Sequence, residues 1–226
     1  MKIKFLLIFC LATAMLSGCA EKTSTQNGST SSAVQDSNSS VENDIKYIDV
    51  SADWPVYENT DKLIKAANVV ILGKVTGISF QILDLKNGGS PTEDSEPQNC
   101  CFCTIYDVEV GTSYKGNTAS KLQFFIEGGL KEEYVKEQIA ALVDFDKKEI
   151  PVMEDMPKIE IDETYLFVLY QYEDKMPTLI NPEQGMYKLD APLEKDVFSY
   201  VSPKDIISYF GEDRWTEFIS EEDAAE

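Results

Sequence analysis

The side chains best equipped for chemistry in this chain are three closely spaced thiols in the run Cys100-Cys101-Phe102-Cys103. Thiolates form disulfides, exchange with other thiols and bind soft metal ions. In an extended strand Cys101 and Cys103 would lie on one face and Cys100 on the other. A metal site would need a fourth ligand that no second cysteine cluster supplies, so we predict no metal. Two interpretations stay open: buried, incidental cysteines, or a disulfide or redox role.

Histidine is absent from the sequence, and this limits the catalytic chemistry open to the chain. Ser-His-Asp and Cys-His arrangements are excluded, together with the most common zinc ligand. Paired carboxylates could serve as general acid and base, but the 40 acidic residues form many pairs and none stands in a recognisable sequence frame. We therefore predict a non-enzymatic protein with no catalytic residue and no cofactor.

Two acidic segments have the side chains that a divalent cation requires. Residues 144–149 superficially resemble a calcium loop, but they lack the glycine at the sixth position and the glutamate at the twelfth. Glu93, Asp94 and Glu96 form a second cluster. Both segments are predicted to be solvated loops, with weak calcium binding left open.

The N-terminus carries a signal for a covalent modification. Lys2 and Lys4 precede the apolar run Phe5–Leu16, and small residues follow, which is the pattern of an export signal. The run has 12 residues, short of the roughly 20 that cross a bilayer. Leu16-Ser17-Gly18-Cys19 resembles the lipobox of bacterial lipoproteins. The resemblance implies cleavage after residues 1–18 and a lipid on Cys19, which holds the chain at the outer face of the bacterial cytoplasmic membrane. An uncleaved anchor with an incidental cysteine is the alternative.

The balance of charge disfavours anionic partners. Cleavage of residues 1–18 removes two lysines and leaves 18 basic against 40 acidic residues, a formal charge of −22. Such a surface repels nucleic acid, anionic lipid headgroups and anionic wall polymers. A cationic partner or divalent ions are accommodated more easily. The simplest interpretation is an acidic exterior that keeps a tethered protein soluble.

Composition divides the mature chain into three parts. Residues 19–44 are rich in Ser, Thr and Asn, and they hold too few large apolar side chains to offset the entropy cost of ordering. They are predicted to form a disordered tether with an r.m.s. reach of about 25–30 Å. Residues 45–220 carry the apolar and aromatic side chains of a single globular domain. Residues 221–226 form an acidic tail.

The hydrophobic pattern predicts a mainly β domain. Alternating or continuous apolar residues indicate strands over 69–78, 104–110, 121–126, 165–170, 176–180 and 185–189. Helices are expected over 61–67, capped by Asn59 or Thr60, over 130–143, and from Ser202-Pro203 onward, with a further short helix around Trp215. Residues 84–99 and 144–161 are expected to be loops.

Three segments, taken in order, resemble a known domain. Ala67-Asn68-Val69-Val70 enters the first strand, Tyr114-Lys115-Gly116 forms a turn, and Tyr165-Leu166-Phe167 lies in a late strand. The pattern is similar to uncharacterised lipoproteins of Gram-positive bacteria and, more distantly, to the netrin-like domain of tissue inhibitors of metalloproteinases. Over residues 60–190 it implies a five-stranded Greek-key barrel of the oligonucleotide/oligosaccharide-binding (OB) type. With the predicted helices, this gives a barrel preceded by a short helix and followed by C-terminal helices.

Activity does not follow from the fold. The metalloproteinase inhibitors grip the catalytic zinc through a free N-terminal cysteine on the first strand, whereas Cys19 is expected to be acylated and separated from the barrel by the tether. We therefore predict a lipid-anchored barrel that binds a protein or peptide and no nucleic acid. Inhibition of an extracellular protease and binding of cell-wall carbohydrate through barrel aromatics are the alternatives.

Overall fold

A computed structural model of the chain describes residues 45–116, 118–142, 149–154, 156–189 and 201–211. Its strands are β1 (Lys46–Val50), β2 (Val69–Asp84), β3 (Cys100–Lys115), β4 (Lys121–Glu127), β5 (Glu149–Met153), β6 (Thr164–Tyr170), β7 (Thr178–Leu179) and β8 (Met186–Lys188). Its helices are α1 (Thr60–Ala66), α2 (Val135–Ala141) and α3 (Pro203–Tyr209), with a 3-10 turn at Pro97–Asn99.

Five of these strands close into a barrel. β2 pairs with β3, β3 with β4, β4 with β7 and β7 with β6, and β6 returns to pair with β2, while β8 extends the sheet from β6. The pairing of β4 with β7 is parallel and the other barrel pairings are antiparallel. The fourth barrel strand, β6, lies beside the first, which is the Greek-key arrangement. The predicted fold, a mainly β, OB-like barrel with a few helices around it, is confirmed.

Bulges allow β2 to pair with two neighbouring strands, β3 and β6. The register of β2 against β3 shifts between Val70 and Ile71, between Leu72 and Gly73, and between Val75 and Gly77. Each bulge bends the strand and increases its twist. The first part of β2, Val69–Lys74, therefore also pairs with β6, and the rest continues along β3 as far as Asp84.

Alternate residues of the barrel strands fill its interior. On β3, Tyr106 and Val108 face inward and Val110 packs against them, as the sequence pattern predicts. The rings of Tyr106 and Phe124 stack with their centroids 5.1 Å apart, and the ring centroids of Phe124 and Phe167 lie 4.9 Å apart. Aromatic pairs at these separations contribute stability beyond the area they bury. The interior is therefore a packed core.

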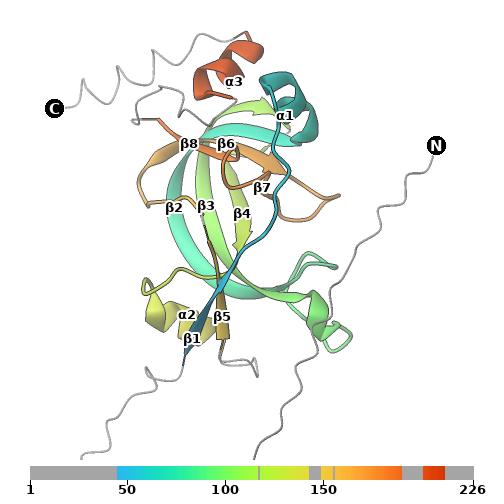
Figure 1. Cartoon of the computed structure of the whole chain (residues 1–226), viewed down its shortest axis with the longest axis vertical. Helices are drawn as coiled ribbons and strands as arrows, with labels where there is room; N and C mark the ends of the chain where they lie inside the picture. The colour runs from blue at the N-terminus through green and yellow to red at the C-terminus, as the bar shows by residue number, and fades with distance from the viewer. Residues whose placement is uncertain (1–44, 117, 143–148, 155, 190–200, 212–226) are drawn as a thin grey trace, which may run out of the picture. The chain divides into compact units, whose positions relative to one another are not determined.

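Figure 1 shows α1 and α3 together at one end of the barrel, and α2 with β1 and β5 at the opposite end. The predicted caps are present: the Asn59 side chain accepts from the Lys62 amide, and Ser202 and Asp205 form a reciprocal capping box. Both helices lie on the outer face of β2 and β6, where Leu63 and Ile206 are fully buried.

Two expectations from the sequence need correction. Residues 144–161 are not a loop throughout, because β5 pairs in parallel with β1 between Lys46 and Val50, a contact across distant sequence that no local pattern signals. The helix expected over 130–143 is α2 alone, since Tyr134 adopts a left-handed conformation with φ 49°. The helix around Trp215 and the tail lie outside the described residues.

Candidate binding site between two loops

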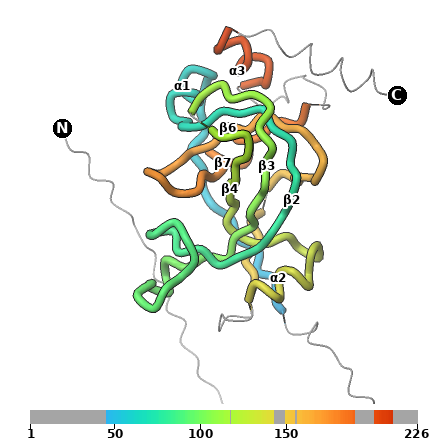
Figure 2. The backbone as a smooth tube through the Cα atoms, turned by 180° about the vertical axis from the view of Figure 1, so that it is seen from behind, coloured from blue at the N-terminus to red at the C-terminus, as the bar shows by residue number. Residues whose placement is uncertain are grey.

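In OB barrels, ligands bind on the outer face of the second and third strands, between the loops that join strands one to two and four to five. The corresponding parts here are β3, β4 and the loops of residues 85–99 and 171–177. Both loops project on the same side of the barrel in Figure 1 and in the reverse view of Figure 2. β3, β4 and these two loops therefore form the candidate binding face.

The face itself is covered by the protein's own side chains. Cys103 and Ile105 lie on the outer face of β3 but are 0% and 1% exposed. Leu85 and Met176 from the two loops and Phe125 from β4 pack over this face. A polymer cannot lie across β3 and β4 in this conformation, so binding is restricted to what the loops leave open.

The opening that remains is a small apolar pocket of about 100 Å³. Leu83, Leu85, Phe125 and Met176 form its apolar wall, and Tyr170 and Tyr172 stand beside it. At roughly 30 Å³ for each water molecule, the space corresponds to about three waters, which is the size of one aliphatic side chain. The pocket therefore fits a single apolar group.

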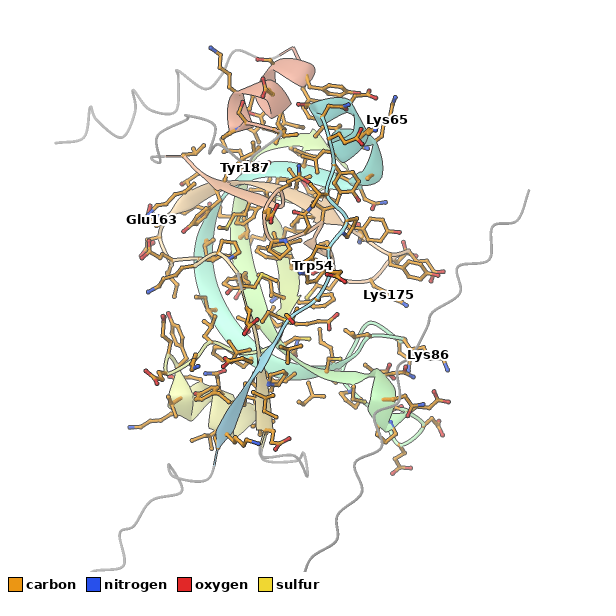
Figure 3. The ribbon with its side chains drawn as sticks, in the orientation of Figure 1. Trp54, Lys65, Lys86, Glu163, Lys175 and Tyr187 are labelled. Atoms are coloured by element: carbon orange, nitrogen blue, oxygen red, sulfur yellow. The ribbon has the colours of Figure 1, made fainter. Side chains whose placement is uncertain are left out.

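Lys175 joins the two loops beside this pocket. Its ammonium nitrogen Nζ donates to the Leu85 carbonyl oxygen at 3.4 Å and lies 4.7 Å from the centre of the Tyr172 ring. Its aliphatic stem packs so closely on Gly88 that a Cβ atom there would stand 2.7 Å from the Lys175 Cγ atom. Gly88 has φ +77°, which further restricts the position to glycine. Lys175 and Lys86 lie on the same side of the molecule in Figure 3.

A buried carboxylate holds the longer loop in shape. Asp84 is 1% exposed and accepts from the backbone amides of Lys86 and Asn87, from the Asn87 side chain and from the Ser95 hydroxyl. The Ser95 hydrogen bond, followed by the two backbone amides, holds the pKa of Asp84 below its usual value. A carboxylate with four donors is satisfied without a metal ion, so Asp84 organises the loop and leaves no open coordination site.

The rim of the pocket combines aromatic rings with acidic groups. Tyr170 and Tyr172 are 43% and 56% exposed, and burial together with Tyr170 raises the pKa of the neighbouring Tyr57. The loops also carry a set of exposed carboxylates: Glu93, Asp94, Glu173 and Asp174. Of the basic side chains here, Lys86 lies 4.0 Å from Glu96, and Lys175 is engaged as described. The rim therefore offers stacking surfaces and negative charge.

The thiols singled out in the sequence stand beside this site. Cys100, Cys101 and Cys103 lie at the start of β3. As the alternation predicts, Cys101 and Cys103 lie on the outer face, and Cys100 packs with Phe102 on the other. Burial, with Glu127 and Cys101 adding to it, raises the pKa of Cys103, so this thiol stays protonated and unreactive.

Other predicted site residues are not brought together. Glu93, Asp94 and Glu96 sit on the surface loop, and no group of three or more potential metal-binding side chains occurs within the described part of the chain. Residues 143–148, with most of the calcium-like segment, lie outside it, as do Cys10 and Cys19. The lipid attachment therefore stays a prediction.

Comparison with known proteins gives no further guide. No model of a known protein family matches the chain, and no curated protein matches it either. Among the helices that the structure describes, none has the length and apolar character needed to cross a membrane.

The pocket could not be predicted from the sequence, because its walls come from three separate segments, residues 83–88, 125 and 170–178. One signal was available. Tyr170 ends an apolar strand and Tyr172 follows within a polar turn, so two large rings are placed where water is expected.

Proposed function

We propose that this chain is a lipid-anchored, non-enzymatic protein at the outer face of the bacterial cytoplasmic membrane, and that its barrel binds a protein or peptide partner. The observation that carries the binding role is the apolar pocket between the two loops, with exposed Tyr170 and Tyr172 beside it. The partner places one apolar side chain in the pocket, and flanking basic residues of the partner face the carboxylates of both loops.

Three properties of the site favour a peptide with one apolar anchor over a long chain that lies along the strands. The outer face of β3 and β4 is covered, the pocket accepts one apolar side chain, and the surrounding charge is negative. Apolar anchors in small pockets supply much of the affinity of peptide interfaces, while complementary charge raises the association rate. Cell-wall carbohydrate is the second candidate, because exposed tyrosine rings also stack on sugars.

A site-specific crosslinking experiment tests the binding role. A photoreactive benzoylphenylalanine replaces Tyr172 in the full chain in its native envelope, and the same substitution at Tyr209 of α3, 46% exposed, is the control. We expect a discrete protein adduct from position 172 that is absent from position 209 and is lost when Met176→Trp fills the pocket. Equal adducts at both positions, or none at 172, would contradict the proposal. A polysaccharide adduct at 172 would replace the peptide with the carbohydrate candidate.

The anchor is tested separately with a radiolabelled or alkyne-tagged palmitate. Cys19→Ala is expected to abolish labelling of the chain, because Cys19 provides the acylated thiol in the lipobox-like segment. Cys10→Ala is the matched control and should leave the label in place, since Cys10 lies in the leader that is removed. Persistent labelling of Cys19→Ala would rule out the proposed anchor.

A further inference from the structure

A second cavity opens where β5 lies beside the end of β4, on the opposite face of that strand from the pocket between the loops. It has a volume of about 240 Å³, and apolar side chains from several segments line it: Ile126, Leu130, Val152, Met153 and Met156. The residues that form it are distinct from those of the pocket between the loops. At roughly 30 Å³ for each water it holds about eight water molecules, enough for a small organic molecule.

A buried hydroxyl is aimed into this cavity. Tyr106 is 2% exposed, and its ring is held in the core by the stack on Phe124. The hydroxyl makes no hydrogen bond to any residue that the structure describes, and it is absent from the fully enclosed polar atoms that lack a partner, so the oxygen reaches the cavity. A hydroxyl in this position can pair with water or with a ligand in the cavity. It therefore offers a ligand one directional hydrogen bond at an otherwise apolar wall.

Residues 128–133 form one wall of the cavity, and unfavourable backbone conformations occur within this segment and directly after it. Glu132 and Tyr134 have φ values of 62° and 49°, in the left-handed region that non-glycine residues seldom adopt. Gln138, 0% exposed, holds this segment, because its side chain accepts from the Leu130 amide and donates to the carbonyl oxygens of Leu130 and Glu133. Strain that the surrounding structure maintains in this way is concentrated at binding sites.

The close packing of Gln138 against this wall requires a glycine at position 129. A Cβ atom at Gly129 would stand 2.1 Å from the Gln138 side-chain oxygen and 2.5 Å from the Ile150 Cγ2 atom. Any larger residue there would displace Gln138. The wall is thus held by contacts that specify both its position and its residues.

The formal charges of the residues that line the cavity sum to zero. Glu133 pairs with Lys158 and Lys131 pairs with Asp49, each at 3.3 Å. Glu127 also lines the cavity, and partial desolvation raises the pKa of this carboxyl. Two acidic and two basic residues among the lining residues leave no net formal charge. Burial raises the pKa of Tyr106, which therefore remains a neutral donor and acceptor.

We infer that this cavity is a second binding site, for a small, uncharged, mainly apolar molecule that carries one hydroxyl or carbonyl group to pair with Tyr106. The apolar walls take the body of the molecule, and the two methionines adapt to its outline. The site does not depend on the partner proposed for the pocket between the loops.

Four probes that share a tolyl group test the site: p-cresol, toluene, p-toluate and 4-methylbenzylamine. Binding to the full chain in detergent micelles is followed by the methyl NMR signals of Met153 and Met156, with Met176 of the other pocket as the off-site control. We expect p-cresol to shift the first two signals at lower concentration than the other three probes, with Met176 unchanged. No shift by any probe at millimolar concentration, or equal shifts at Met176, would overturn the inference.

Two variants separate the hydroxyl from the cavity. Tyr106→Phe should weaken p-cresol binding about three- to tenfold and leave toluene unchanged, because one hydrogen bond is lost. Equal weakening of both probes would contradict the role of the hydroxyl. If Tyr106→Phe does not fold, Met156→Trp provides the test, since its ring fills the cavity. It should abolish the Met153 shifts for every probe, and retained shifts would overturn the site.

Discussion

The barrel has two covered outer faces, and they are covered by different means. On β2 and β6, two helices bring branched aliphatic side chains down on the strands, and Leu63, Val168 and Ile206 are all 0% exposed. On β3, two loops provide the cover, and a pocket remains beside Leu85 and Met176. Helices repeat their side chains at a spacing that fills a surface, whereas loops meet at a few points. The first face supports the fold and the second has room for a ligand.

The largest expected effect comes from removing matched leucines on the two faces. Leu63→Ala, under the helices, should lower the free energy of unfolding by about 2–5 kcal/mol, because a fully buried side chain leaves a cavity. Leu85→Ala, half-buried on the loop-covered face, should cost about 1 kcal/mol or less. Urea unfolding of the full chain measures both values. Equal losses would mean that the two faces contribute equally.

The next largest effect, a gain in stability, is expected from replacing Tyr187 on the helix-covered face, labelled in Figure 3. Its hydroxyl is buried without a hydrogen-bond partner in the part of the chain that the structure describes, and burial, with Asp205, raises its pKa. Tyr187→Phe keeps the ring and removes the unpaired oxygen. We expect stability to rise by up to about 1 kcal/mol, measured by thermal unfolding. A loss of stability would show that the hydroxyl is paired in solution.

Acid should loosen the loop-covered face first. Asp84 has a pKa below its usual value of 3.8, so its stabilising hydrogen bonds are fully present above that pH and are lost as pH falls through the lower folded value. Amide NMR signals of Lys86 and Asn87 should therefore move below about pH 4. The control, Asp84→Asn, should remove this dependence. An identical acid transition in both proteins would assign it to another group.

The smallest effect on global stability is expected at Lys175. Lys175→Met keeps the stem on Gly88 but removes the bond to the Leu85 carbonyl and the contact with the Tyr172 ring. The free energy of unfolding should change by less than about 1 kcal/mol, while the amide hydrogens of residues 85–89 should exchange faster with solvent. Lys86→Met is the matched control. Exchange that is the same in both variants would show that Lys175 does not join the loops.

Much of the barrel could be predicted from the sequence. Tyr106, Val108 and Val110 alternate with Asp107 and Glu109, and the run Tyr165–Tyr170 is apolar on both faces, because a strand with water on one side and a strand buried on both leave different patterns. The caps at Asn59 and Ser202 were equally visible, since they depend on neighbours three residues away.

Neither cavity could be predicted in this way. The pocket beside Tyr172 needs Leu85, Phe125 and Met176, and the second needs Tyr106, Leu130 and Met153, which lie far apart in sequence. β5 was missed for the same reason, because its partner β1 is about a hundred residues away. Local patterns record what each segment does with its own neighbours, whereas these contacts depend on the closure of the barrel.

The sequence by itself therefore determined the class of fold, the alternation of each long strand, the ends of two helices and the absence of histidine chemistry. Tertiary structure alone decided that loops would cover the β3 face, that Asp84 would be satisfied by four donors, and that the Tyr106 hydroxyl would be left unpaired beside a cavity. The physical reason is range: hydrophobic periodicity and capping act within a few residues, while burial and hydrogen-bond pairing depend on which distant segments meet.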